Sequence, residues 1–303
     1  RGDGTLVWEG VADTTYVPVS WYGGRGVFGG GRVSSATNVI DYITISTTGN
    51  AIDFGDMSVA RYSHSGCSDG SRGVFAGGDS YNTIDYITIS TLGNATDFGD
   101  LTGSREGTAA CSDSTKGVFG MGYQGGYTNL IEYVTIQTTG NSVDFGDMTN
   151  TRSWGGACAD STRGVFGGGN AGGSTYMDVI DYITIATTGN ATDFGDLTVG
   201  REEVEATSDT TRGIWAGGGS NSDVIDYVTI QTTGNATDFG NLSVGRSSAG
   251  ACSDGVKGVF GGGAGSSGNF NTIDYVTVAT TGNALDFGDL TETRRQAAAC
   301  SGD

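Results

Sequence analysis

The chain has 303 residues, of which 56 are glycine and one is proline, and no run of helix-forming residues recurs at helical spacing. This composition favours a sheet-rich protein with many tight turns and almost no helix. The formal net charge of -19 argues against a nucleic-acid partner, because phosphate binding requires clustered cations. No apolar stretch is long enough for membrane insertion.

Residues 1–22 precede the first repeated segment, and we expect them to form an N-terminal extension or linker. They lack the charged start, apolar core and cleavage pattern of a signal peptide. The remaining residues, 23–303, are expected to form a single domain built from repeats.

A repeat runs through residues 23–303, and an acidic residue before a Tyr marks each copy at intervals of 44 to 49 residues. Each copy contains four short strands, here termed a, b, c and d, separated by Gly, Asn, Asp and Ser turn signals. In the second copy, these strands are expected within 61–70, 71–78, 82–90 and 95–100. The marker residues are Asp41, Asp85, Glu132, Asp181, Asp226 and Asp274.

The most faithful segment of the repeat is the turn from strand c into strand d, which reads TTGNATDFGD at residues 187–196. Its Gly-Asn pair tolerates positive φ and so favours a tight turn. Because this segment hardly changes between copies, we interpret it as scaffold that every copy needs.

Four-stranded units repeated six times around an axis predict an all-β, six-bladed β-propeller. The two ends of the repeat region support a closed ring. Residues 23–31 (GGRGVFGGG) provide a strand b with no strand a before it, whereas residues 293–303 (TRRQAAACSGD) provide a strand a with no strand b after it. We therefore expect the N- and C-terminal segments to pair within one blade.

The framework of each copy resembles the kelch repeat: an Arg, a stretch of small residues, an apolar strand ending in Gly-Gly, a Tyr and a later aromatic residue. The kelch Trp is replaced here by Phe54, Phe98, Phe145, Phe194, Phe239 and Phe287. In keeping with that resemblance, a framework Arg in each copy is expected to pair with a framework carboxylate or carbonyl. These are Arg61, Arg105, Arg152, Arg201, Arg246 and Arg294.

The sequence pattern DYITI..TTGNATDFGDLT also resembles kelch-like propellers in virion structural proteins, such as tail or fibre proteins, of marine tailed phages. That resemblance implies a virion protein, assembled in the host cytoplasm, whose partners are other virion proteins.

The cysteines occupy the same place in strand a of their copies, with Thr207 in the remaining copy. Equivalent positions on different blades lie too far apart for a disulfide, which needs Cα atoms within about 7 Å. We expect small, buried apolar residues with free thiols. They are Cys67, Cys111, Cys158, Cys252 and Cys300.

The chain has one histidine, His64, which limits catalytic chemistry and cannot supply the His pair of kelch-type copper oxidases. Asp193 and Asp196 are the kind of oxygen ligands that Ca²⁺ prefers, but the favoured interpretation is that such residues cap turns. The sequence therefore predicts no catalytic residue, no metal site and no cofactor. Glu202, Glu203 and Glu205 leave a glycan hydrolase as the weaker alternative.

The copies differ in the b–c loops and in the segments after the framework Arg, which in an up-and-down blade emerge on the same face. We call this the variable face, and the opposite side, with the a–b and c–d turns, the constant face. The variable loops are rich in Tyr, Gly, Ser and Asn, as binding loops are, although neutral drift of exposed loops also produces variation. The candidate contact residues are Tyr62, His64, Tyr81, Tyr123, Tyr127, Trp154, Tyr176 and Phe270.

These patterns favour a non-enzymatic binding module on a virion, which recognises a host receptor or host surface glycan through the variable face. The alternative is a purely structural decoration or connector protein that docks through the constant face.

Overall fold

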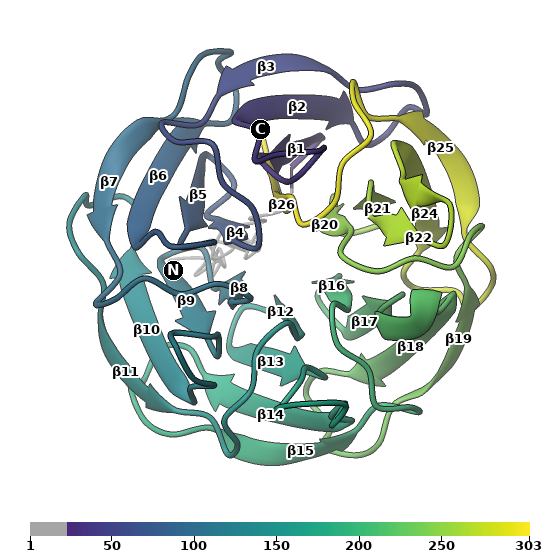
Figure 1. The fold of residues 1–303 in the computed structure, drawn as a ribbon. Coiled ribbons are helices and arrows are strands. Elements are labelled where there is room, and N and C mark those ends of the chain that lie inside the picture. Colours follow the sequence, from purple (N-terminus) through teal and green to yellow (C-terminus); the bar gives the residue numbers. More distant parts are fainter. Residues whose placement is uncertain (1–22) are drawn as a thin grey trace, which may run out of the picture.

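The computed structural model describes residues 23–303 and shows a six-bladed β-propeller of four-stranded antiparallel sheets (Figure 1). The predicted fold is confirmed, whereas the expected extension at 1–22 lies outside the described residues. None of the helices in the described part is long and apolar enough to cross a membrane.

Each blade uses its strands in the expected order, from a at the axis to d at the outer rim. The innermost strands are β26 (Ala298–Gly302), β4 (Ser65–Ser68), β8 (Ala109–Ser112), β12 (Gly156–Ala159), β16 (Glu205–Ser208) and β20 (Gly250–Ser253). The second strands are β1 (Arg25–Gly29), β5 (Arg72–Ala76), β9 (Lys116–Gly120), β13 (Arg163–Gly167), β17 (Arg212–Ala216) and β21 (Lys257–Gly261).

The outer half of each blade is the c–d hairpin. The third strands are β2 (Val39–Thr44), β6 (Thr83–Thr88), β10 (Leu130–Thr135), β14 (Val179–Thr184), β18 (Val224–Thr229) and β24 (Thr272–Thr277). The outermost strands are β3 (Ile52–Asp56), β7 (Thr96–Asp100), β11 (Val143–Asp147), β15 (Thr192–Asp196), β19 (Thr237–Asn241) and β25 (Leu285–Asp289). Two b–c loops carry extra elements, the 3₁₀ turn η1 (Gly219–Asn221) and the hairpin of β22 (Ala264–Gly265) and β23 (Gly268–Asn269).

The ring closes as the sequence predicts, because β26 and β1 pair within one blade. Their antiparallel register joins Arg25 to Gly302, Val27 to Cys300 and Gly29 to Ala298. This pairing covers the inner edge of β1, so both ends of the described chain lie in one sheet.

The blades pack against one another through small residues of the inner strands. A Cβ atom on Gly73 in β5 would lie only 2.7 Å from the Sγ atom of Cys300 in the preceding blade, so glycine leaves room for the thiol. The same contact joins Gly117 to Cys67. The cysteines are buried and free, as predicted. Burial raises the pKa of Cys300 to about 12, which keeps this thiol protonated and unreactive.

In each blade, a buried ion pair joins the framework Arg before strand a to the carboxylate of strand c. In the second blade, Arg61 Nη1 lies 2.9 Å from Asp85 Oδ2, and Arg61 Nη2 donates to the Phe75 carbonyl at 3.1 Å. The framework pairs, all with almost fully buried side chains, are Arg61–Asp85, Arg105–Glu132, Arg152–Asp181, Arg201–Asp226, Arg246–Asp274 and Arg294–Asp41. Losing one partner of such a pair leaves an uncompensated charge, which costs about 3–5 kcal/mol.

The c–d turns, nearly constant among the six copies, join each blade to its neighbour at the rim. The Asp196 N–H donates to Asn235 Oδ1 of the next blade at 3.2 Å, and the Gly234 N–H donates to the Phe194 carbonyl at 2.8 Å. We call the full circle of these bonds the rim belt. Its side-chain acceptors are Asn50, Asn94, Asn141, Asn190, Asn235 and Asn283, at 3.1 to 3.2 Å from the backbone nitrogens.

The rim belt explains why TTGNATDFGD is so faithfully repeated. Its Asn supplies an inter-blade acceptor, and its second Gly approaches the neighbouring turn too closely for a side chain. Gly195 has φ +147°, and a Cβ there would lie 2.5 Å from the carbonyl of Gly234. These contacts depend on residue type, so every blade needs the same residues.

Candidate functional site

The variable face has its own ring of hydrogen bonds, at the mouth of the central channel. The second residue after each framework Arg adopts a left-handed conformation, with φ between 53° and 64°. Each of these residues donates its N–H to the carbonyl of the equivalent residue in the preceding blade, over 2.6 to 3.1 Å. The pairs, donor first, are Ser63–Gln296, Gly107–Ser63, Trp154–Gly107, Glu203–Trp154, Ser248–Glu203 and Gln296–Ser248. We call this closed ring the axial belt.

Because the axial belt uses only backbone groups, it does not specify the side chains of its members. A left-handed conformation costs a residue other than glycine about 1–3 kcal/mol, and the ring of hydrogen bonds holds these residues in it. The six belt positions therefore present different side chains, among them an indole, a carboxylate and a carboxamide.

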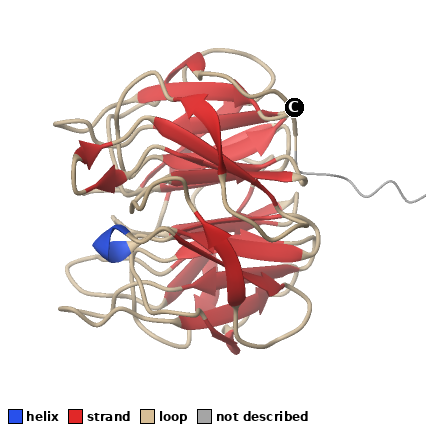
Figure 2. Cartoon of the chain, turned by 90° about the vertical axis from the view of Figure 1, so that its right-hand side faces the viewer, coloured by secondary structure: helices blue, strands red, loops and turns tan. Residues whose placement is uncertain are grey.

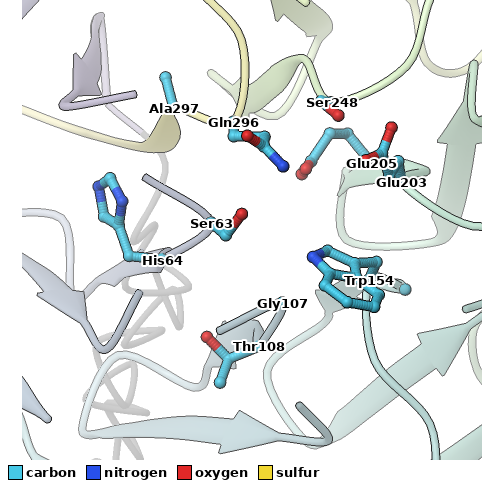
Figure 3. Close-up of a pocket in the computed structure, with 11 residues that line it drawn as sticks. Ser63, His64, Gly107, Thr108, Trp154, Glu203, Glu205, Ser248, Gln296 and Ala297 are labelled. Carbon is cyan, nitrogen blue, oxygen red and sulfur yellow. The ribbon is translucent and has the colours of Figure 1, made fainter. Parts of the chain in front are cut away.

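These side chains line a small pocket, with a cavity volume of about 30 Å³, on the propeller axis, which we call the axial pocket (Figure 3). Its walls are Ser63, His64, Gly107, Thr108, Trp154, Gly155, Glu203, Glu205, Ser248, Gln296 and Ala297. Below it, further small cavities of about 40 and 90 Å³ follow the innermost strands, whose small side chains leave the channel open. The pocket is thus the mouth of an axial channel.

Glu205 breaks the symmetry of this channel. It is the first residue of β16, and the equivalent positions of the other blades hold Ser65, Ala109, Gly156, Gly250 and Ala298. Burial, with the nearby charge of Glu203, raises the pKa of Glu205 well above its usual value. Glu203 is hydrogen-bonded to Ser247, whose Oγ donates to Glu203 Oε2 at 2.7 Å.

Several buried polar atoms around the axial pocket have no hydrogen-bond partner in the protein. They are Ser63 Oγ, Ser248 Oγ, Trp154 Nε1 and Gln296 Oε1. Ser63 and Ser248 are at least nine-tenths buried. Since a buried polar group without a partner is costly, these atoms mark a place suited to a polar ligand.

His64 lies at the edge of this pocket, against the ring of Phe75 at 6.1 Å between centroids. Burial lowers the pKa of His64 well below its usual value, and the Arg61 guanidinium lowers it further. The imidazole is therefore neutral at physiological pH.

An aromatic cluster adjoins the axial pocket and shares Trp154 with it. The Trp154 ring is stacked near Tyr123 at 6.2 Å between centroids and 17° between planes, and it meets Tyr127 edge-on at 6.4 Å. Tyr123 and Tyr127 contact each other at 5.3 Å. A Cβ on Gly107 would lie 2.7 Å from the indole, so only glycine leaves room for the ring there.

The other predicted contact residues remain in their own loops. Tyr62 lies under the Arg32 guanidinium at 5.2 Å, and Phe270 packs against Gly265 of the β22–β23 hairpin. Tyr81 and Tyr176 are 37% and 40% exposed. The hairpin and η1 project from the same side of the propeller (Figure 2).

Trp154, Tyr123 and Tyr127 were predicted from the sequence as contact residues, whereas Ser248 and Gln296 were not. Glu203 and Glu205 entered only as carboxylates of the weaker alternative, a glycan hydrolase. One signal was available. The segment EEVEA places Glu205 where the other copies have a small residue at the start of strand a.

Within residues 23–303, no group of three or more His, Cys, Asp or Glu side chains is placed to hold a metal ion. Asp193 is exposed and Asp196 half-buried on β15. Turn capping by Asp occurs instead in the a–b turns, where Asp160 Oδ1 accepts from the Thr162 and Arg163 N–H groups, both at 2.8 Å.

No protein-family model matches the chain, and no curated protein matches it by sequence. The resemblance to kelch repeats and to phage virion propellers therefore rests on the motifs of the sequence.

Proposed function

We propose that this propeller is a non-enzymatic binding module that recognises a glycan through the variable face. The observation that carries the proposal is the position of Trp154, which belongs to both the aromatic cluster and the axial pocket. A sugar ring stacked on the cluster is next to polar atoms that have no partner within the protein.

Stacking and hydrogen bonding have separate roles in this arrangement. Aromatic rings offer large apolar area to the face of a sugar ring, and tightly packed binding sites depend on a few such anchors. Trp154 Nε1, Ser63 Oγ and Ser248 Oγ supply donors and acceptors for hydroxyl groups. Binding pockets commonly combine apolar walls with a few convergent polar groups of this kind.

We further propose that the module belongs to a virion, where its partners are other virion proteins and its glycan lies on the host surface. The support is the kelch-like framework together with the segment DYITI..TTGNATDFGDLT, which resembles propellers in structural proteins of marine tailed phages.

A purely structural role is the second candidate, and one observation favours it. Ile52, Leu92 and Leu285 are 58%, 52% and 59% exposed around the c–d hairpins of three successive blades. Exposed apolar side chains at the rim suit docking onto a neighbouring particle protein.

Binding to a glycan array or to host cell envelopes tests the proposal, with wild type, Trp154→Ala and Tyr127→Ala compared. Each substitution is expected to weaken binding about thirtyfold, as loss of an anchor worth about 2 kcal/mol would do. Tyr81→Ala is the matched control: the sequence makes Tyr81 a candidate contact, but the structure places this exposed Tyr in its own loop, outside the aromatic cluster.

Thermal melting of each variant separates lost contacts from lost folding. The glycan proposal fails if wild type binds neither glycans nor envelopes. It also fails if Tyr81→Ala weakens binding as much as Trp154→Ala does. Binding to particle proteins through the rim would then favour the structural role.

A further inference from the structure

The axial pocket has an excess of hydrogen-bond acceptors. Glu203 and Glu205 contribute carboxylate oxygens, and Gln296 contributes an Oε1 atom with no partner. The hydroxyls of Ser63 and Ser248 can accept as well as donate. A group rich in N–H donors would satisfy this set better than a neutral hydroxyl group would.

The charge of the pocket also favours a ligand group that is rich in N–H donors. None of its lining residues is Lys or Arg, and the buried Arg201 nearby is already paired with Asp226 at 2.6 Å. His64, the other titratable group of the lining, is neutral because burial lowers its pKa. The two glutamates therefore face the axial pocket without a protein cation among its walls.

Independent evidence for a ligand comes from the buried polar side chains. Ser63 and Ser248 are 6% and 4% exposed, their Oγ atoms have no partner, and both lie around the same space as the glutamates (Figure 3). The indole of Trp154 closes another side of the pocket, and its Nε1 atom also has no partner in the protein.

We propose that the axial pocket binds the primary ammonium group of an amino sugar, held by Glu205 and Glu203 while the sugar ring stacks on the aromatic cluster. This inference rests on the proposed glycan-binding function and specifies its ligand class. It also explains why one innermost strand carries Glu205 where the others carry small residues.

Three tetrasaccharides with the same linkage test the inference by calorimetry: β-1,4-linked glucosamine, N-acetylglucosamine and glucose. They differ only in the group on carbon 2, and the glucose tetramer controls for the size of the acetyl group. The glucosamine tetramer is expected to bind at least tenfold more tightly than the other two, since hydrogen bonds between charged groups are the stronger ones.

The Glu205→Gln variant keeps the shape of the side chain and removes its charge. We expect it to abolish the preference for glucosamine while leaving affinity for the glucose tetramer within about twofold. Glu106→Gln is the matched control, because Glu106 lies on the variable face but outside the lining of the axial pocket. This control is expected to retain the preference.

The pH dependence provides a separate readout. Because the pKa of Glu205 is raised, its carboxyl group stays protonated to a higher pH than that of an ordinary glutamate, and ammonium binding favours the charged form. Affinity for the glucosamine tetramer should therefore rise with pH through the pKa of Glu205 and fall again once the ligand amine loses its proton. Glu205→Gln should remove the rising limb.

Two results would overturn the inference. If all three tetramers bind equally and require Trp154, the glycan-binding function holds and the ammonium site does not. If none of them binds and envelopes do not bind either, both proposals fail.

Discussion

The rim belt and the axial belt are two rings of inter-blade hydrogen bonds that are built in different ways. The rim belt uses the Oδ1 atom of an Asn and the close approach of a Gly, so its residues are nearly identical in every blade. The axial belt uses only backbone N–H and carbonyl groups, and its six residues are of five different types.

This difference shows how a repeat protein can keep the same residues at some equivalent positions of its blades and vary them at others. Where a contact depends on a side chain, every copy must keep that side chain. Where the backbone alone makes the contact, side chains are free to differ, and at the axial belt they face a common pocket. Residue differences between the blades therefore occur at the axial belt, whose hydrogen bonds do not depend on side chains.

The largest expected effect comes from opening the axial belt while leaving the rim belt complete. Deleting residues 294–303 removes β26, the belt residue Gln296 and the partner of Asp41, whereas the Asn50 contact with Asp289 remains. We expect a loss of at least about 5 kcal/mol, since a buried carboxylate loses its partner and β1 loses its neighbour.

Chemical denaturation followed by circular dichroism measures this loss. A truncated protein that unfolds as cooperatively as the intact one, and at the same denaturant concentration, would show that the ring stays closed without β26 and the axial belt.

A smaller effect is expected from crowding the rim belt. Gly195→Ala places a methyl group 2.5 Å from the Gly234 carbonyl in a conformation that disfavours side chains, and we expect a loss of about 3 kcal/mol. Gly189→Ala is the matched control, because its φ of +158° is similar but no atom lies within 4 Å of the added carbon.

The control is expected to cost about 1 kcal/mol at most, from conformation alone. Equal melting temperatures for the two variants would contradict a role for close approach at the rim.

The smallest effects compare one side chain from each belt. Asn190→Ala removes the acceptor of the Asp147 N–H, and we expect a loss of about 1 kcal/mol. Ser248→Ala keeps both backbone hydrogen bonds of its position, so stability should change by less than about 0.5 kcal/mol. Denaturant midpoints measure both, and a costlier Ser248 substitution would mean that the axial belt depends on its side chains.

The fold could be predicted closely because its determinants recur. The repeat period, the turn residues and the unmatched strands at 23–31 and 293–303 together specify the blades and the closure, and the structure confirms both. The kelch resemblance also implied that each framework Arg pairs with a framework carboxylate or carbonyl, and Arg61 contacts both Asp85 and the Phe75 carbonyl.

The axial pocket was harder to predict because its backbone conformation leaves no mark in the sequence. Ser63 and Trp154 adopt positive φ, which composition alone would assign to glycine, as it does correctly at Gly107. The convergence of Glu205 with Trp154 depends on the radius of the innermost ring, and no spacing along one strand encodes it.

The register that closes the ring also determines how it would respond to mechanical load. Arg25 pairs with Gly302 at one end of the β1–β26 ladder, so residues 24 and 303 lie side by side at that end. A force that separates residue 24 from residue 303 would open that ladder one rung at a time, because such unzipping loads each hydrogen bond singly. A force applied between two points on the outer rim bypasses this seam and must be borne by the contacts between blades.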